Sequence, residues 1–165
     1  MATPKPRSSS RLAVAVRIAS AGWRAPGFAP AGAAARRAVR AAFASADMAA
    51  RGAVSVCLSD DAHMQELNRA WRGRNRATNV LAFPPPQEVR RSTGLWGDII
   101  LAQETVLREA EAERRAPQQH LSHLVIHGTL HLLGYDHDTD AAARRMQRLE
   151  RAALAECPPQ WMARP

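Results

Sequence analysis

Four histidines recur along residues 123–138, "HLVIHGTLHLLGYDHD", with a spacing that restricts how the segment can fold. His127 and His131 are four residues apart, so a helix places both imidazoles on one face, one turn apart. Gly134 is the residue type expected at the left-handed position that ends such a helix. The chain can then reverse and bring His137 back toward the same face. The pattern H-x-x-x-H-x-x-G-x-x-H therefore predicts a helix, a glycine turn and three converging imidazoles.

Three imidazoles in this arrangement suit zinc best among the common cellular metals. Six histidines in 165 residues would match both spacings by chance at a frequency of about 0.01, so the pattern points to a metal site. Three protein ligands leave the fourth tetrahedral position to water or substrate, which indicates chemistry at the ion. We therefore expect one zinc ion per chain, bound by His127, His131 and His137.

The other polar residues near this block have less certain roles. His120 and His123 fall on or near the same helix face, and His123 is a candidate for supporting the site or contacting substrate. Asp136 and Asp138 could orient an imidazole, although an aspartate after a helix is more often a cap. His63 stands alone and is interpreted as an ordinary hydrogen-bonded polar residue.

Gly128 argues against one familiar use of this histidine spacing. Metzincin-type proteases share the spacing, with a glutamate directly after the first histidine that acts as general base on the metal-bound water. Glycine cannot take a proton, so the ligand geometry is retained without the proteolytic base. A phosphodiester is already anionic, and a metal with a nearby arginine can stabilise the charge that develops on its oxygens.

The segment "WRGRNRATNVLAFP", residues 71–84, could supply that arginine. Arg72, Arg74 and Arg76 alternate around a glycine, directly before an expected strand and next to Trp71. Composition alone favours a solvated basic loop. The alternative is a loop that holds an anionic substrate.

The apolar pattern predicts an α+β chain that forms a single domain. A chain of 165 residues with 46% apolar content can bury one core and is too short for two. The domain should span residues 11–157, after a disordered lead at 1–10 and before a tail at 158–165. Four strands, at 12–18, 53–59, 79–83 and 95–102, face about five helices, at 32–46, 61–71, 103–115, 117–133 and 141–156.

Two of these helices carry clear signals at their ends and on their apolar faces. Asp60 or Asp61 can cap the helix that runs through Trp71, and Met64, Leu67 and Trp71 should share one face of it. The last helix can be capped by Asp138, Thr139 or Asp140. Its apolar stripe is formed by Met146, Leu149 and Ala153.

The net charge of +8 is concentrated at the N-terminal end. Residues 1–46 hold Lys5 and seven arginines without an acidic residue, whereas residues 47–165 hold 15 basic and 15 acidic residues. Three interpretations remain open. The excess could attract phosphate groups, it could be an organellar transit peptide, or it could reflect the compositional bias of a chain with 22 arginines and one lysine.

Cysteine use and hydropathy indicate a reducing compartment. Cys57 and Cys157 form no C-x-x-C pair, so neither a disulfide framework nor a thiolate zinc site is indicated. No apolar run approaches the roughly 20 residues needed to cross a bilayer. We therefore expect a cytoplasmic location, without secretion or a membrane span.

Three motifs, "WRGRNRATNVLAFP", "GDIIL" and "HGTLHLLGYDH", occur in the order seen in the YbeY-type endoribonuclease family of bacterial rRNA maturation factors, which this chain resembles over roughly residues 53–155. The resemblance implies a small mixed sheet, one zinc ion and cleavage of single-stranded RNA. It also implies action in ribosomal RNA maturation, at the 3′ end of the small-subunit rRNA, and in ribosome quality control. The implied partners are ribosomal RNA and the small ribosomal subunit with its associated proteins, without a membrane or a nucleotide cofactor.

Carried over by position, the family's zinc ligands fall on His127, His131 and His137, and its essential loop arginine falls on Arg72. Arg74 is a weaker candidate for binding substrate, as is His123. Two rival functions remain at this point. One is a zinc-dependent hydrolase of another substrate, including a metalloprotease-like enzyme, and the other is a non-catalytic ribosome-associated RNA-binding protein with a structural zinc.

The chain departs from the family's usual pattern at three positions. Trp71 stands where tyrosine is common, and Arg74 where lysine is common, so ring and charge are kept. Ala82 stands where the family usually has serine, so no hydroxyl can be assumed to act there.

Overall fold

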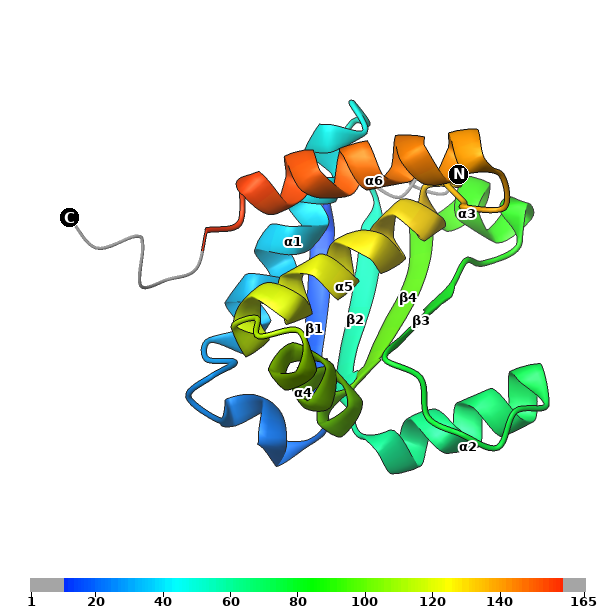
Figure 1. The fold of residues 1–165 in the computed structure, drawn as a ribbon. Coiled ribbons are helices and arrows are strands. Elements are labelled where there is room, and N and C mark those ends of the chain that lie inside the picture. The colour runs from blue at the N-terminus through cyan, green and yellow to red at the C-terminus, as the bar shows by residue number, and fades with distance from the viewer. Residues whose placement is uncertain (1–10, 159–165) are drawn as a thin grey trace, which may run out of the picture.

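The computed structural model describes residues 11–158, which form a four-stranded mixed sheet with helices packed against it (Figure 1). The strands are β1 (Ala13–Ile18), β2 (Ala53–Ser59), β3 (Val80–Phe83) and β4 (Leu95–Ala102). They lie in the order β1-β2-β4-β3, with β1, β2 and β4 parallel and β3 antiparallel to β4. The expected mixed sheet is confirmed, and β3 is an edge strand.

Helices connect the strands, and three more follow the last strand. They are the short 3-10 helix η1 (Ala21–Arg24) and the α-helices α1 (Ala31–Ser45), α2 (Asp61–Arg72), α3 (Gln87–Thr93), α4 (Gln103–Ala112), α5 (Pro117–Leu132) and α6 (Asp140–Ala155). Within residues 11–158, no helix has both the length and the apolar character that a bilayer-spanning segment needs. The lead at 1–10 and the tail beyond residue 158 lie outside the described residues, so those domain limits stay predictions.

Two elements differ from the expectation. No helix was expected between the strands at 79–83 and 95–102, but α3 lies there, and Pro86 precedes its first turn, where a missing N–H costs nothing. Gly94, with φ 73°, ends that helix. The helix expected to reach residue 115 ends at Ala112, because the chain turns into the left-handed region at Arg114, with φ 53°.

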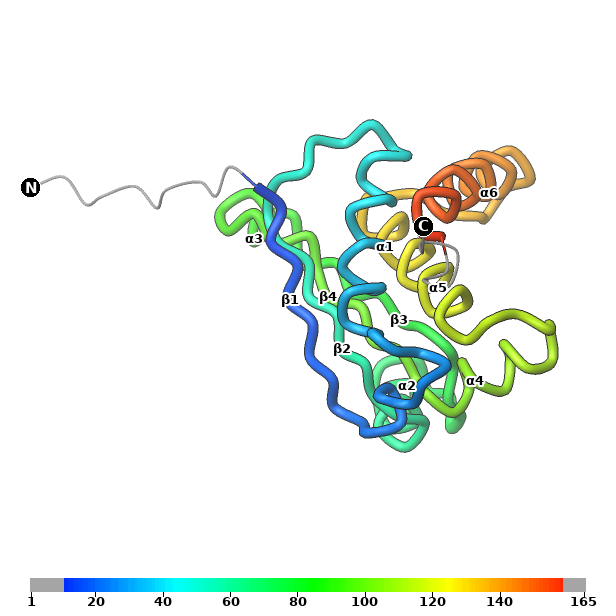
Figure 2. The backbone as a smooth tube through the Cα atoms, turned by 90° about the vertical axis from the view of Figure 1, so that its left-hand side faces the viewer, coloured from blue at the N-terminus to red at the C-terminus, as the bar shows by residue number. Residues whose placement is uncertain are grey.

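The main core lies between the sheet and three helices, α1, α5 and α6, which Figure 2 shows on one side of the strands. Val54, Val56, Ile99 and Leu101 alternate along β2 and β4 and are at most 1% exposed. Each such side chain stabilises the fold by about 1.5–3 kcal/mol relative to an exposed one. These buried side chains thus form the surface on which α5 packs.

A smaller cluster on the opposite face holds α2. Met64, Leu81 and Ala102 are its buried members, and Asp60 caps the helix by accepting a hydrogen bond from the N–H of His63. The expectation that Trp71 shares the inner face is wrong, because Trp71 is 72% exposed. Asn68 is buried there instead. The end of α2 extends past the edge of the sheet (Figure 1), so Trp71 meets β3 at the ring of Phe83 and stays largely exposed.

Gly128 sets how closely α5 approaches the sheet. A Cβ at this position would lie 3.0 Å from Cγ2 of Ile99 and 3.5 Å from Cγ2 of Val80. A larger side chain would push the helix away from β3 and β4. Glycine in the position of the metzincin glutamate therefore also serves the packing of the helix that carries His127 and His131.

Gly97 is the position where the sheet itself tolerates no side chain. Its φ is 141°, and an added Cβ would lie 2.3 Å from the backbone oxygen of Phe83 on β3. We expect Gly97→Ala to lower the free energy of unfolding by about 2–4 kcal/mol, since backbone strain and overpacking add. Gly94→Ala is the matched control: its φ is also positive, but its nearest neighbour is 3.6 Å away, so it should cost only about 1–2 kcal/mol. Denaturant unfolding measures both, and equal losses would contradict the close approach.

Candidate metal centre

The three predicted ligands come together at the end of α5. The ring centroids of His127 and His131 are 4.6 Å apart. Gly134, with φ 96°, turns the chain back, so the His137 ring lies 5.2 Å from that of His131 and 5.8 Å from that of His127. One ligand atom from each residue lies within 4.8 Å of the other two. This group can hold a metal ion.

The donor atoms also face in the correct direction. The Nε2 atoms of His127 and His131 point at each other across 3.1 Å. Ligand atoms about 2.0–2.1 Å from a tetrahedral ion are roughly 3.3 Å apart, so the observed separation matches a small ion placed between them. His137 is exposed while the other two are half-buried, so the group opens to one side.

Glu150 of α6 contacts the imidazole of His127 at the ring nitrogen that faces away from the ion site. Its Oε1 lies 2.6 Å from Nδ1 of His127, and its Oε2 lies 3.3 Å from Nε2 of His123. An ionised carboxylate only accepts, so Nδ1 of His127 donates and Nε2 keeps its lone pair toward the ion site. A carboxylate behind a ligand imidazole fixes both the tautomer and the orientation of the ring.

The ionisation of these groups favours metal binding. Burial opposes the ionisation of Glu150, but hydrogen bonds from His123 and His127 and the charges of both rings lower its pKa to about 2. Burial, together with the neighbouring His127 and His137 rings, lowers the pKa of His131 below its ordinary value. The carboxylate is therefore charged and His131 neutral at physiological pH, as metal ligation requires.

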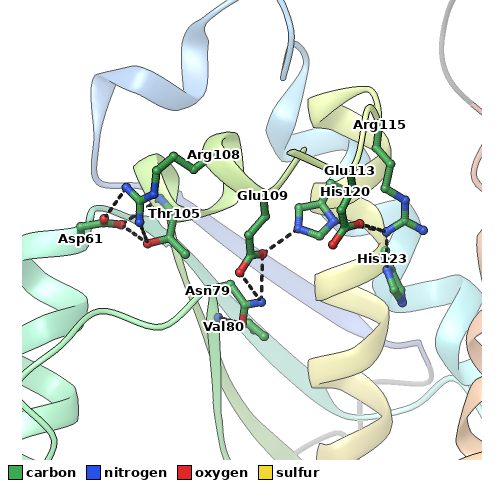
Figure 3. A network of polar contacts seen from close by, with 10 residues as sticks. All are labelled: Asp61, Asn79, Val80, Thr105, Arg108, Glu109, Glu113, Arg115, His120 and His123. Carbon is green, nitrogen blue, oxygen red and sulfur yellow. Dashed lines mark hydrogen bonds and ion pairs between the residues drawn. The ribbon is translucent and has the colours of Figure 1, made fainter. Parts of the chain in front are cut away.

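Arg115 extends this arrangement by one further contact. Its Nη1 lies 3.1 Å from Nδ1 of His123 (Figure 3). Arginine only donates, so Nδ1 of His123 accepts and its Nε2 donates to Glu150. His123 therefore lies behind the ligand set, in the position expected of a supporting residue. Its part in any reaction stays a prediction.

A second polar group joins three elements beside the histidines. Nε2 of His120, a buried residue of α5, lies 2.8 Å from Oε2 of Glu109 on α4. The Glu109 carboxylate also accepts from Nδ2 of Asn79 at 3.1 Å, directly before β3 (Figure 3). The side-chain oxygen of Asn79 in turn accepts from the N–H of Val80 at 2.7 Å. These contacts fix the start of the edge strand against α4 and α5.

A pocket of about 990 Å³ opens over both groups. Arg72, at the end of α2, lines it together with His123, His127, His131 and His137, so five of the six predicted site residues lie at one cavity. Val80, Ala82 and Pro84 form the wall at β3, so the hydroxyl that Ala82 lacks would have belonged to the pocket surface. Arg74 is not among the lining residues, and its predicted contact with substrate stays untested.

The two aspartates beside His137 do not orient a ring. In the part of the chain that the structure describes, the Asp136 carboxylate accepts only from the N–H of Asp138, at 3.4 Å. The hydroxyl of Thr139 caps α6, by accepting from the N–H of Ala142. His63 is hydrogen-bonded to Ser59 at 2.7 Å, which confirms its interpretation as an ordinary polar residue.

Glu150 is the site residue that the sequence analysis missed. Its buried neighbours on α6 are Met146 and Ala153. Glu150 stands four residues after the first and three before the second, so it lies on the inner face of the helix. An acidic residue on an inward stripe is the signal that could have revealed it, because a buried carboxylate needs a partner.

Comparisons with known proteins agree with this geometry. The family model described as "Endoribonuclease YbeY" matches residues 30–158. The chain belongs to the YbeY family. A relative named "Endoribonuclease YbeY" from Bartonella henselae is 50% identical over 103 residues, which are 61% of this chain and 65% of that protein. One of the same name from Azorhizobium caulinodans is 49% identical over 123 residues, covering 72% of this chain and 76% of that protein.

The fold is also similar to a solved one. The solution structure of a protein from Thermotoga maritima matches with a TM-score of 0.64 and 24% identity, over 92% of this chain and 93% of that one. This likeness concerns the fold alone. The match to the Bartonella henselae YbeY relative spans just under two thirds of that relative's length, 65%.

The role of Glu150 can be tested through metal affinity. In Glu150→Gln the side chain keeps its size, but it can no longer accept from both His123 and His127. We expect the affinity for a divalent metal to fall by about 10- to 100-fold, as measured by competition with a chelator. Glu156→Gln, an exposed carboxylate at the end of the same helix, is the control and should bind metal as the wild type does. Unchanged affinity in Glu150→Gln would remove Glu150 from the site.

Proposed function

We propose that this protein is a zinc-dependent endoribonuclease that cleaves single-stranded RNA. The observation that carries the proposal is one pocket with three imidazoles on one side and an arginine, Arg72, lining the same space. The relatives named "Endoribonuclease YbeY" support RNA as the substrate.

We further propose one zinc ion per chain at His127, His131 and His137. Three neutral imidazoles form a donor set that suits zinc, and the short Nε2 to Nε2 distance of 3.1 Å favours a small tetrahedral ion. When bound, the ion would act as a Lewis acid on a phosphate oxygen or on water.

The chain's own residues would position and stabilise the substrate. The Arg72 guanidinium can contact a phosphate in the pocket and offset the charge that develops on its oxygens. Glu150 holds His127 in the tautomer that ligation needs, and Arg115 holds His123 against Glu150. Neither Glu150 nor His123 is free to take a proton from substrate without breaking this chain of contacts.

A peptide bond is a poorer substrate for this pocket than a phosphodiester. The position that carries the general base of metzincins is Gly128, which is packed against Ile99. The carboxylates that line the pocket are Glu109, Glu113 and Glu150, and each already has a hydrogen-bonded or charged partner. An anionic substrate instead meets Arg72, whose side chain has no ion-pair partner among the described residues.

The cellular role that we propose is maturation of ribosomal RNA, at the 3′ end of the small-subunit rRNA, and ribosome quality control. Membership of the YbeY family and the relatives named "Endoribonuclease YbeY" support an action on RNA, and the ribosomal role is the one that the resemblance implies. The partners would be the small ribosomal subunit and its associated proteins, in the cytoplasm.

His131→Ala should abolish both metal binding and RNA cleavage, since two imidazoles cannot retain zinc at micromolar chelator. Metal analysis and cleavage of a labelled single-stranded RNA give the two readouts. His63→Ala is the matched control, because His63 contacts Ser59 outside the pocket. A chelator-sensitive peptidase activity without RNA cleavage in the wild type would overturn the proposed function.

Arg72→Ala should keep the metal and lose RNA turnover, by about 100-fold or more if Arg72 stabilises the developing phosphate charge. Arg24→Ala, an exposed arginine of η1, controls for the loss of one positive charge. Metal content and cleavage rate are measured on the same preparations. Equal cleavage rates for Arg72→Ala and the control would exclude Arg72 from the mechanism.

A further inference from the structure

Trp71 is the most exposed large apolar side chain in the described part of the chain, at 72%. By contrast, Trp23 is fully buried, and Trp96 is half-buried with its indole N–H bonded to the backbone oxygen of Arg51. A single exposed apolar residue is common on protein surfaces. Its surroundings must therefore decide whether Trp71 has a function.

The ring of Trp71 lies against the edge strand that forms one wall of the pocket. It contacts Phe83 of the edge strand β3, with ring centroids 6.2 Å apart and planes tilted by 60°. Ala82 and Pro84, the residues on either side of Phe83, line the pocket, and so does Arg72, the next residue after Trp71. The indole thus lies just across the edge strand from the histidines, supported on one side and open to solvent on the other.

Four arginines lie close to Trp71 along the chain. Arg69 and Arg72 lie in the last turn of α2, and Arg74 and Arg76 follow in the loop. None of these four side chains makes an ion pair or hydrogen bond within residues 11–158, whereas Arg108, which contacts the first turn of α2, is paired with Asp61. The buried Asn68 holds the loop in place by donating to the backbone oxygen of Arg76 at 2.7 Å. An exposed ring beside a run of unpaired arginines matches how proteins bind single-stranded nucleic acid.

We propose that Trp71 is a stacking platform for an unpaired nucleobase of the RNA, adjacent to the nucleotide whose phosphate contacts Arg72. The inference rests on the proposed function and explains its preference for single strands. Bases in a duplex are already stacked and paired, so they cannot lie on the indole unless the helix opens. The neighbouring arginines hold the backbone while the ring selects for a free base, of any identity, because every base has a π face.

The test is a binding experiment on the full chain, freed of metal with a chelator so that the RNA stays intact. Trp71→Ala should weaken binding of a short single-stranded oligoribonucleotide by about 5- to 100-fold, whereas Trp71→Phe should stay close to the wild type. Binding to a duplex of the same sequence should be equal in all variants. Met48→Ala is the control for losing an exposed apolar side chain, since Met48 is 36% exposed and does not line the pocket.

Oligonucleotides with one abasic position sharpen the result. If one base stacks on Trp71, an abasic nucleotide should weaken binding to the wild type when it occupies one particular position of the oligonucleotide. The same change should have no effect on binding to Trp71→Ala. The inference is overturned if Trp71→Ala binds the intact single strand as tightly as the wild type does, or if it loses duplex binding equally. The latter result would indicate that Trp71 only supports the fold or contacts another macromolecule.

Cleavage measured separately, with zinc restored, distinguishes this inference from the proposed function. If the wild-type protein binds single strands through Trp71 but never cleaves them, this result contradicts the endoribonuclease function and supports the stacking role of Trp71. If the wild-type protein cleaves RNA and Trp71→Ala binds and cleaves it equally well, the stacking role of Trp71 is overturned and the endoribonuclease function is supported.

Discussion

The packing of α5 between the sheet and α6 is the constraint on which the rest of the structure depends. Ten of its sixteen residues are buried, so the helix has little freedom to rotate or slide. His127 and His131 emerge from the one stripe that faces the pocket, and Gly128 lets that stripe lie close to β3 and β4. Two of the three metal-binding rings are therefore positioned by the core of the protein rather than by a loop.

The third ring and the carboxylate come from the turn before α6 and from α6 itself. The turn at Gly134 returns His137 to the site, and Thr139 then starts the helix that carries Glu150. Because Glu150 contacts both His123 and His127, the orientation of these two imidazoles depends on how α6 packs on α5. A change that loosens α6 would disturb the metal centre without touching a ligand.

The features predicted from sequence were those that local spacing encodes. The histidine spacing placed three rings on one site, and alternation placed the four strands within a residue of their observed bounds. Contacts between segments distant in sequence were not encoded in this way. The partner of His127 lies 23 residues away on another helix, and Trp71 has apolar spacing but lies beyond the last strand that could bury it. The helix α3 was missed because its prolines suggested an end rather than a beginning.

Clustering three imidazoles has a consequence for the metal-free chain. The pKa of His131 is lowered by burial and by its two ring neighbours, so the unfolded chain takes up this proton at a higher pH than the folded chain does. The unfolded state therefore binds more protons just below pH 6.5, the ordinary value for histidine, and acid favours unfolding there. A metal ion at this site would be attracted by the ring nitrogens and would favour the folded arrangement that brings all three together, so it would stabilise the protein by mass action. The same close approach of rings that allows the site to hold a metal ion would thus couple folding to metal supply.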